Sequence, residues 1–318
     1  MQTLLAMQGA SRAMVTKKSI KRIWRAGRTG LVIPDGTVSD LSQSSSNTYL
    51  QIKQKALALE QLYSDAGVLL SPSSDLARLI TDAKGLSDSW LIDSIEKIQT
   101  TQLFRVGHLD RIAEAALPLR DVPARIGFLT ALASGSLDLL ERKKSKAKDT
   151  LWELELWAIL KRRSFNAALE EPPDIVVDFQ DFRIGIACKK LYSEKHVQSV
   201  LSKAVAQIEA SFDFGIVAVN LDDLVPANMI LQTPTQETMS RKIDDLNARF
   251  LRSHERHFRK YLASGRLISA LVTTGVLADV YQARVRFNTA RQSTVWTIPG
   301  LSPDKDRVLR NFYNRLMT

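Results

Sequence analysis

The chain has 318 residues, of which 45% are hydrophobic, and its 44 lysines and arginines against 34 acids give a formal net charge of +10. This composition is too apolar for a disordered chain and is sufficient for one large or two ordinary domains, while the excess of basic residues favours a polyanionic partner, nucleic acid before a membrane surface. No run of about 18 apolar residues occurs, which excludes a predicted transmembrane segment, and the single cysteine, Cys188, excludes an internal disulfide and favours a cytoplasmic location.

Residues 1–48 are predicted to form a basic, partly irregular N-terminal segment that ends in a polar linker. The stretch from Met1 to Pro34 has no acid but carries several basic residues: Arg12, Lys17, Lys18, Lys21, Arg22, Arg25 and Arg28. Three interpretations stay open, namely an arm that contacts phosphate, an organelle transit peptide and a solvated tail.

Residues 49–135 are predicted to form an all-α region of several short helices. Apolar residues recur at helical spacing from Tyr49 to Gly67, and the run Ser71 to Asp75 offers N-caps for a second helix. No strand pattern is present between residues 50 and 135. Three roles stay open for this region: recognition of the target, contact with a protein partner, and contact with a second copy of the chain.

Residues 140–318 are predicted to form an α/β domain. Leu137 to Arg163 is expected to be one long helix, or two helices that break near Ser145. The elements expected after it are strands over 175–177 and 182–188, a helix over 197–210, a buried strand over 215–221, a helix over 238–262, a buried strand over 267–277 and edge strands over 283–298. This order predicts a mixed β-sheet flanked by helices.

Three polar residues of this domain have coherent chemistry: Glu153 on a predicted helix, Asp174 at the start of a strand, and Lys189 at the end of the next strand. Mg²⁺ binds a few carboxylates together with water and phosphate oxygens. A lysine beside the ion orients or deprotonates the attacking water and offsets negative charge. The set therefore predicts metal-assisted hydrolysis of a phosphodiester.

The ordered runs Trp152-Glu153-Leu154, Pro172-Pro173-Asp174-Ile175 and Ile186-Ala187-Cys188-Lys189-Lys190-Leu191 resemble the PD-(D/E)XK nuclease superfamily. The resemblance covers about residues 140–222 and extends to 265–298. It implies a restriction-endonuclease-like sheet and a DNA or RNA endonuclease, with DNA favoured, that uses Mg²⁺ or Mn²⁺. It also implies that Glu153, Asp174 and Lys189 are catalytic and that Glu153 and Asp174 hold the metal. Gln207 and Glu155 are candidate accessory residues; for Gln207 a core or surface position is the favoured interpretation.

Ala187 departs from the family pattern, which has an acid two residues before the lysine. A methyl group cannot bind a metal, so three explanations are open. An acid from elsewhere replaces it, with Glu155, Asp178, Glu194 and Glu209 as candidates; or Glu153 and Asp174 hold the ion alone; or the domain is catalytically degenerate. The function expected is a metal-dependent phosphodiesterase; the alternative is a degenerate nuclease fold that binds nucleic acid or a protein partner.

The helix predicted over 238–262 carries a basic face. Several of its residues, together with a lysine at the strand end, are expected to contact nucleic acid phosphates: Arg249, Arg252, Arg256, Arg259, Lys260 and Lys190. A solvated helix face is the other interpretation. His254 and His257 are three residues apart, which differs from the spacing of a zinc-protease helix, and Cys188 is interpreted as a buried core residue.

Overall fold

The computed structural model describes residues 23–26, 32–35, 38–39, 49–91, 100–227, 229–283 and 287–317. Its helices are α1 (Tyr49–Asp65), α2 (Asp75–Leu91), α3 (Thr100–Ala116), α4 (Arg125–Ser134), α5 (Lys146–Arg162), α6 (Val197–Glu209), α7 (Gln236–Ala263) and α8 (Pro303–Met317). Three short 3-10 turns are η3 (Leu117–Asp121), η4 (Glu194–His196) and η5 (Asp222–Leu224). Apart from β1 to β3, the predicted basic segment 1–48 lies outside the described residues.

The strands form two sheets. They are β1 (Ile23–Ala26), β2 (Val32–Asp35), β3 (Val38–Ser39), β4 (Asn166–Glu170), β5 (Asp174–Phe179), β6 (Phe182–Lys190), β7 (Phe214–Asn220), β8 (Ile230–Thr233), β9 (Ser269–Val280) and β10 (Phe287–Trp296). β1 and β2 pair with each other, and the large sheet has the order β3-β10-β9-β7-β6-β5-β4, with β8 also paired to β9. Because β6, β7 and β9 run parallel while β4, β5 and β10 pair antiparallel with their neighbours, the predicted mixed sheet flanked by helices is confirmed.

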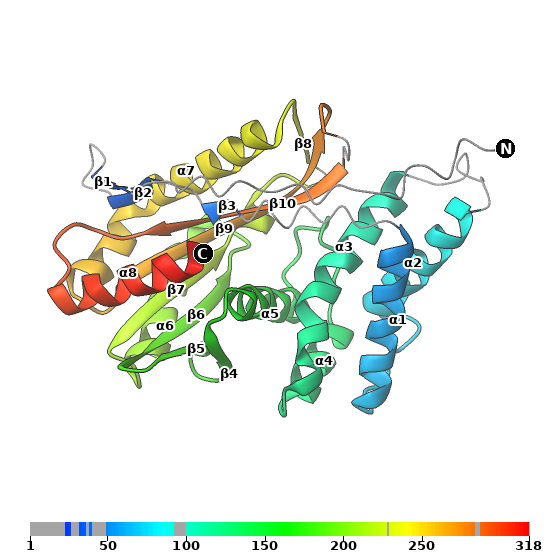
Figure 1. Ribbon diagram of the computed structural model, residues 1–318, viewed down its shortest axis with the longest axis horizontal. Coiled ribbons are helices and arrows are strands. Elements are labelled where there is room, and N and C mark those ends of the chain that lie inside the picture. Colours follow the sequence, from blue (N-terminus) through cyan, green and yellow to red (C-terminus); the bar gives the residue numbers. More distant parts are fainter. Residues whose placement is uncertain are drawn as a thin grey trace, which may run out of the picture.

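The two faces of the large sheet carry different helices. One face packs on α5 and α8, and the apolar cluster there continues through α5 into α1 to α4. The other face packs on α6 and α7. Figure 1 shows α5 between the sheet and the group formed by α1 to α4. None of the helices in the described part of the chain is long and apolar enough to cross a membrane.

Helix α5 begins later than the sequence predicts. Residues 137–145 are not helical, and the hydroxyl of Ser145 caps the helix by accepting a hydrogen bond from the amide of Ala147 at 3.2 Å. The prediction of one helix from Leu137 was therefore wrong, and the predicted break near Ser145 is where the helix starts. Most side chains of α5 are buried, because the helix lies between the sheet on one side and α3 and α4 on the other.

Gly215 lets α6 approach the sheet closely. A Cβ atom at this position of β7 would lie 2.5 Å from Cγ2 of Ile208 on α6. Such a contact is too short for two carbon atoms, so any larger residue would push α6 away from the strands.

We expect Gly215→Ala to lower the free energy of unfolding by roughly 1–3 kcal/mol, because the added methyl overpacks the α6–sheet contact. Urea denaturation measures this change. Gly85→Ala is the matched control: it adds a methyl to α2 where no atom lies within 4 Å, and alanine favours the helix. Equal stability of Gly215→Ala and wild type would contradict the packing argument.

Candidate active site

A cleft of about 950 Å³ opens between α5, the end of β6, η4 and α6. Its acidic side chains come from α5 and include Asp149 and Glu153. Its basic side chains come from four separate segments: Lys144, Lys189, Lys190, His196 and Lys203. A cleft with two carboxylates at one wall and amines around them is suited to a phosphate-bearing ligand.

The structure brings the three predicted catalytic residues together. Lys189 Nζ lies 3.2 Å from Asp174 Oδ2, and the same oxygen accepts a hydrogen bond from the Cys188 amide at 2.6 Å. Glu153 lines the cleft from α5 and interacts electrostatically with both Asp174 and Lys189. The hairpin of β5 and β6 explains this convergence, since it sets the first residue of one strand beside the end of the other.

Burial disfavours charge on both carboxyl groups. Removal from water, followed by the nearby charge of Asp174, raises the pKa of Glu153 to about 8, and Lys189 offsets only part of this rise. The pKa of Asp174 is also raised by burial, although Lys189 and the Cys188 amide act against it. Glu153 is therefore protonated over much of the neutral range, and a cation in the cleft would compete with that proton.

The missing acid is not replaced by any of the four predicted candidates. The register pairs Ile175 with Ile186, so the next position sets Asp174 beside Ala187, which is fully buried among the apolar residues under α6. The candidate acids point elsewhere: Glu155 pairs with Arg111, Asp178 is exposed near the turn of the hairpin, Glu194 pairs with His254, and Glu209 pairs with Arg266. The explanation by a migrated acid at those positions was wrong.

Asp149 is a cleft acid that the sequence analysis missed. It precedes Glu153 by four residues on α5, so the two carboxyl groups share one helix face. Asp149 accepts a hydrogen bond from the Tyr192 hydroxyl at 2.9 Å, which ties α5 to the segment after β6. The spacing of four residues was the signal that could have identified it.

The cleft retains open hydrogen-bonding capacity. Gln207 lines it from α6, and its buried side-chain oxygen has no hydrogen-bond partner within the described ranges. Among the residues that the structure describes, no three His, Cys, Asp or Glu side chains gather closely enough to hold a metal ion by themselves. Mg²⁺ needs few protein oxygens, because it keeps several waters and takes further oxygens from substrate phosphate; the side chains that could offer such oxygens here are Glu153 and Asp174.

The charged groups of Lys190 and Glu155 do not point into the cleft, although Lys190 was predicted to contact phosphate and Glu155 to supply an acid there. Although Lys190 borders the cleft, its ammonium turns inward to Asp223 and Asn220, each at 2.7 Å, and its side chain is only 3% exposed. Glu155 is buried on the opposite side of α5 from Glu153, where Arg111 and Arg291 bind it. Neither side chain can therefore reach a ligand without breaking buried ion pairs.

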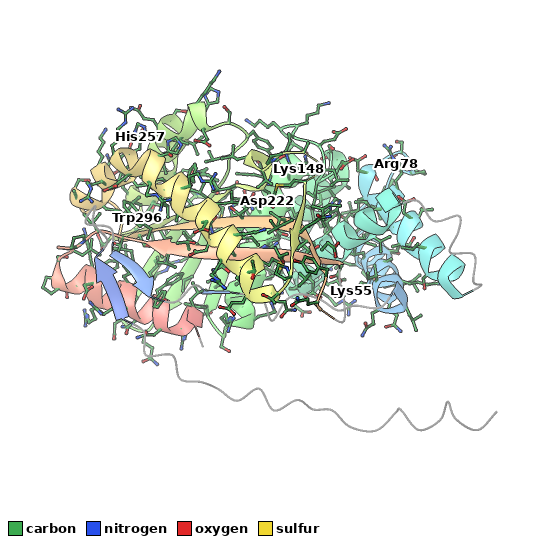
Figure 2. The ribbon with its side chains drawn as sticks, turned by 90° about the horizontal axis from the view of Figure 1, so that it is seen from above. Lys55, Arg78, Lys148, Asp222, His257 and Trp296 are labelled. Carbon is green, nitrogen blue, oxygen red and sulfur yellow. The ribbon has the colours of Figure 1, made fainter. Side chains whose placement is uncertain are left out.

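The predicted basic helix corresponds to α7. Its residues Arg249, Arg252, Arg256 and Lys260 are exposed, whereas Arg259 is held by an ion pair with Glu255 at 2.6 Å. α7 meets the rim of the cleft through His254, which bonds Glu194 of η4 at 2.8 Å. Figure 2 shows His257 on α7 far from Lys55 and Arg78, which lie on the helices at the other end of the molecule.

Comparison of the chain with protein families, with curated proteins and with solved structures found no match.

Glu153 should make stability depend on pH. Its pKa of about 8 in the folded state lies above the ordinary value of 4.5, so the folded protein keeps a proton that the unfolded chain releases between these values. The contribution of this group to stability is fully present below about pH 4.5 and is lost as the pH rises towards 8. We expect wild type to lose stability over this window relative to Glu153→Gln, measured by urea denaturation; parallel curves would contradict the assignment.

Proposed function

We propose that the protein is a metal-dependent phosphodiesterase that acts on nucleic acid in the cleft between α5 and α6. The observation that carries the proposal is that Glu153 and Lys189 line one cleft with basic walls, and that the buried carboxylate of Asp174 contacts Lys189 at the edge of this cleft. Two carboxylates that share a cleft with an amine suit the hydrolysis of a phosphate ester with the help of a cation.

In this proposal each side chain has its own task. Glu153 and Asp174 would hold Mg²⁺ or Mn²⁺, which supplies Lewis acidity and makes a water more acidic. Lys189 orients the attacking water and offsets negative charge on the phosphoryl group, and its contact with Asp174 fixes the position of its ammonium. Gln207 lines the cleft from α6, and its side-chain oxygen, which has no hydrogen-bond partner among the described residues, is the candidate acceptor nearest to this role. Lys144, His196 and Lys203 bind the neighbouring phosphates.

We expect wild type to cleave supercoiled DNA with Mg²⁺ or Mn²⁺, and Asp174→Ala/Lys189→Ala to lose at least about a hundredfold of this activity. Gel electrophoresis of plasmid follows the reaction. Asp178→Ala/Lys161→Ala is the matched control, because both residues are exposed and lie outside the cleft on β5 and α5. Equal residual cleavage by wild type and the Asp174→Ala/Lys189→Ala variant would end the proposal of catalysis.

Substrate binding can be tested without metal. Lys144 and Lys203 are exposed and line the cleft, so Lys144→Ala/Lys203→Ala should weaken binding of a labelled oligonucleotide in EDTA. The slope of log affinity against log salt should fall by about 0.7–0.9 for each phosphate that the variant no longer neutralises. Fluorescence anisotropy measures both quantities. The control Lys161→Ala/Arg120→Ala removes two exposed charges outside the cleft, and an equal loss of affinity there would indicate non-specific attraction only.

One observation favours the second candidate, a binding protein without turnover. Asp174 is already compensated by Lys189 and the Cys188 amide, and Ala187 beside it is apolar. Because Lys189 and the Cys188 amide already stabilise the negative charge of Asp174, a bound cation would add less stabilisation at this carboxylate. Oligonucleotide affinity that depends on the cleft lysines, together with no metal-dependent cleavage, would select this alternative.

A further inference from the structure

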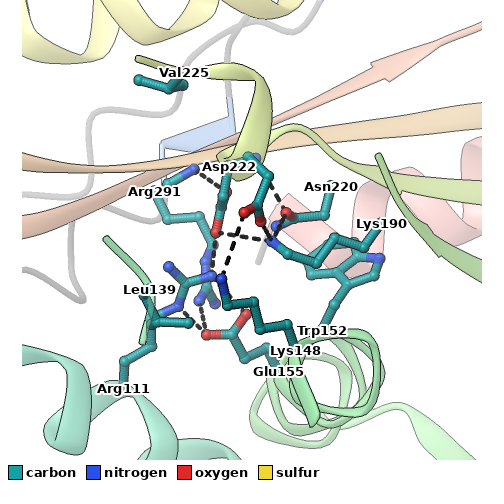
Figure 3. A network of polar contacts seen from close by, with 12 residues as sticks. Arg111, Leu139, Lys148, Trp152, Glu155, Lys190, Asn220, Asp222, Val225 and Arg291 are labelled. Atoms are coloured by element: carbon teal, nitrogen blue, oxygen red, sulfur yellow. Dashed lines mark hydrogen bonds and ion pairs between the residues drawn. The ribbon is translucent and has the colours of Figure 1, made fainter. Parts of the chain in front are cut away.

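A network of buried charges lies behind the cleft. It joins α3, α5, β6, η5 and β10, and every member has a side chain no more than 12% exposed: Arg111, Lys148, Glu155, Lys190, Asp222, Asp223 and Arg291. Figure 3 labels all of these side chains except that of Asp223, and it shows the labelled ones directed towards one another beside α5. Buried charges of this kind are stable only when each has its partners.

Arg111 is the member that comes from the helical region before the sheet. Its guanidinium binds Glu155 through two nitrogens, one of them at 2.9 Å, and it also binds Asp222. Asp222 in turn accepts a hydrogen bond from the Gly275 amide of β9 at 2.7 Å. A Cβ at Gly275 would lie 3.2 Å from Nη1 of Arg111 and 3.3 Å from both carboxylate oxygens of Asp222, so glycine leaves room for this ion pair.

The network holds the same two elements that carry the cleft residues. On β6, Lys190 points into the network, and its neighbour Lys189 points into the cleft because successive side chains of a strand face opposite sides. On α5, Glu155 enters the network, whereas Glu153, two residues earlier, faces the cleft about 200° around the helix. Glu153 and Lys189 thus each have a buried network residue close to them in sequence and on the opposite face.

We infer that Arg111 is a positioning residue for the cleft. Through Glu155 it fixes the rotation of α5, and through Asp222, whose carboxylate lies 3.9 Å from the ammonium of Lys190, it fixes the end of β6. The cleft would then depend on the helical region, although the helical region supplies none of its lining residues. The inference concerns the geometry of the cleft, and only the kinetic readout below rests on the proposed function.

Cys188 provides the test, because it is the single cysteine of the chain and its buried thiol lies beside Lys189 at the end of β6. The measurement is its rate of reaction with a disulfide reagent at fixed pH in the full-length protein. We expect Cys188 of Arg111→Gln to react at least about tenfold faster than Cys188 of wild type. We also expect the rate to change little with urea concentration below the unfolding transition. Weak urea dependence identifies a local opening that exposes little surface.

Two further variants keep the test decisive. Arg111→Lys retains a charge but cannot bridge Glu155 and Asp222 with a fork of donors, so its rate should fall between those of wild type and Arg111→Gln. Arg120→Gln removes an exposed arginine of η3 and should react like wild type. If Arg111→Gln does not fold, Arg111→Lys and Gly275→Ala, which crowds the ion pair without removing charge, give the answer.

An unchanged Cys188 rate in a folded Arg111 variant overturns the inference. A faster rate whose urea dependence equals that of global unfolding overturns it as well, since Arg111 then contributes only to overall stability. If wild type cleaves DNA, Arg111→Gln should lower kcat by about 10–100-fold with little change in KM. If wild type does not cleave, the proposed catalysis fails while the labelling result still decides the inference.

Discussion

The structure depends on the compensation of charge in its interior. Asp222 illustrates the constraint: burial alone would raise its pKa, but Arg111, Lys190 and Arg291 hold the pKa well below its usual range. Loss of one partner would leave an unpaired buried charge, at a cost of roughly 3–5 kcal/mol. Because Asp222 lies on the turn η5 and its partners lie on a helix and two strands that are distant in sequence, the charges can be satisfied only when all of these elements are in place.

Residues that are close in sequence on α5 and β6 lie in two different environments, because their side chains point to opposite faces of the helix or strand. Glu153 and Glu155 are two residues apart, yet burial raises the pKa of the first to about 8, whereas two arginines bind the second. Lys189 and Lys190 differ in the same way, one beside Asp174 at the cleft and the other among buried acids. The chemistry available to each residue follows from the face on which it lies rather than from its type.

Site residues that lie on elements adjacent in sequence could be predicted from the sequence. Glu153, Asp174 and Lys189 could be grouped because a hairpin and its preceding helix are close in sequence, and the turn at Gln180-Asp181 fixes which strand ends meet. Lys190 and Glu155 were misjudged because their partners are distant in sequence: Asn220 is 30 positions from Lys190, and Arg291 is 136 positions from Glu155. No periodicity identifies such a pair, and a buried lysine at a strand end has the same sequence signal as an exposed one. The helical spacing of Asp149 and Glu153, in contrast, was available and was overlooked.

Helix α5 contacts the sheet on one side and α3 and α4 on the other. A helix enclosed in this way has no face along which it can slide or turn without disturbing both neighbours. If Arg111 positions the cleft as inferred, a change that loosens the packing of α3 or α4 also changes how often Glu153 occupies its position at the cleft. The free energy that docks the outer helices and the free energy that orders the cleft are then thermodynamically linked.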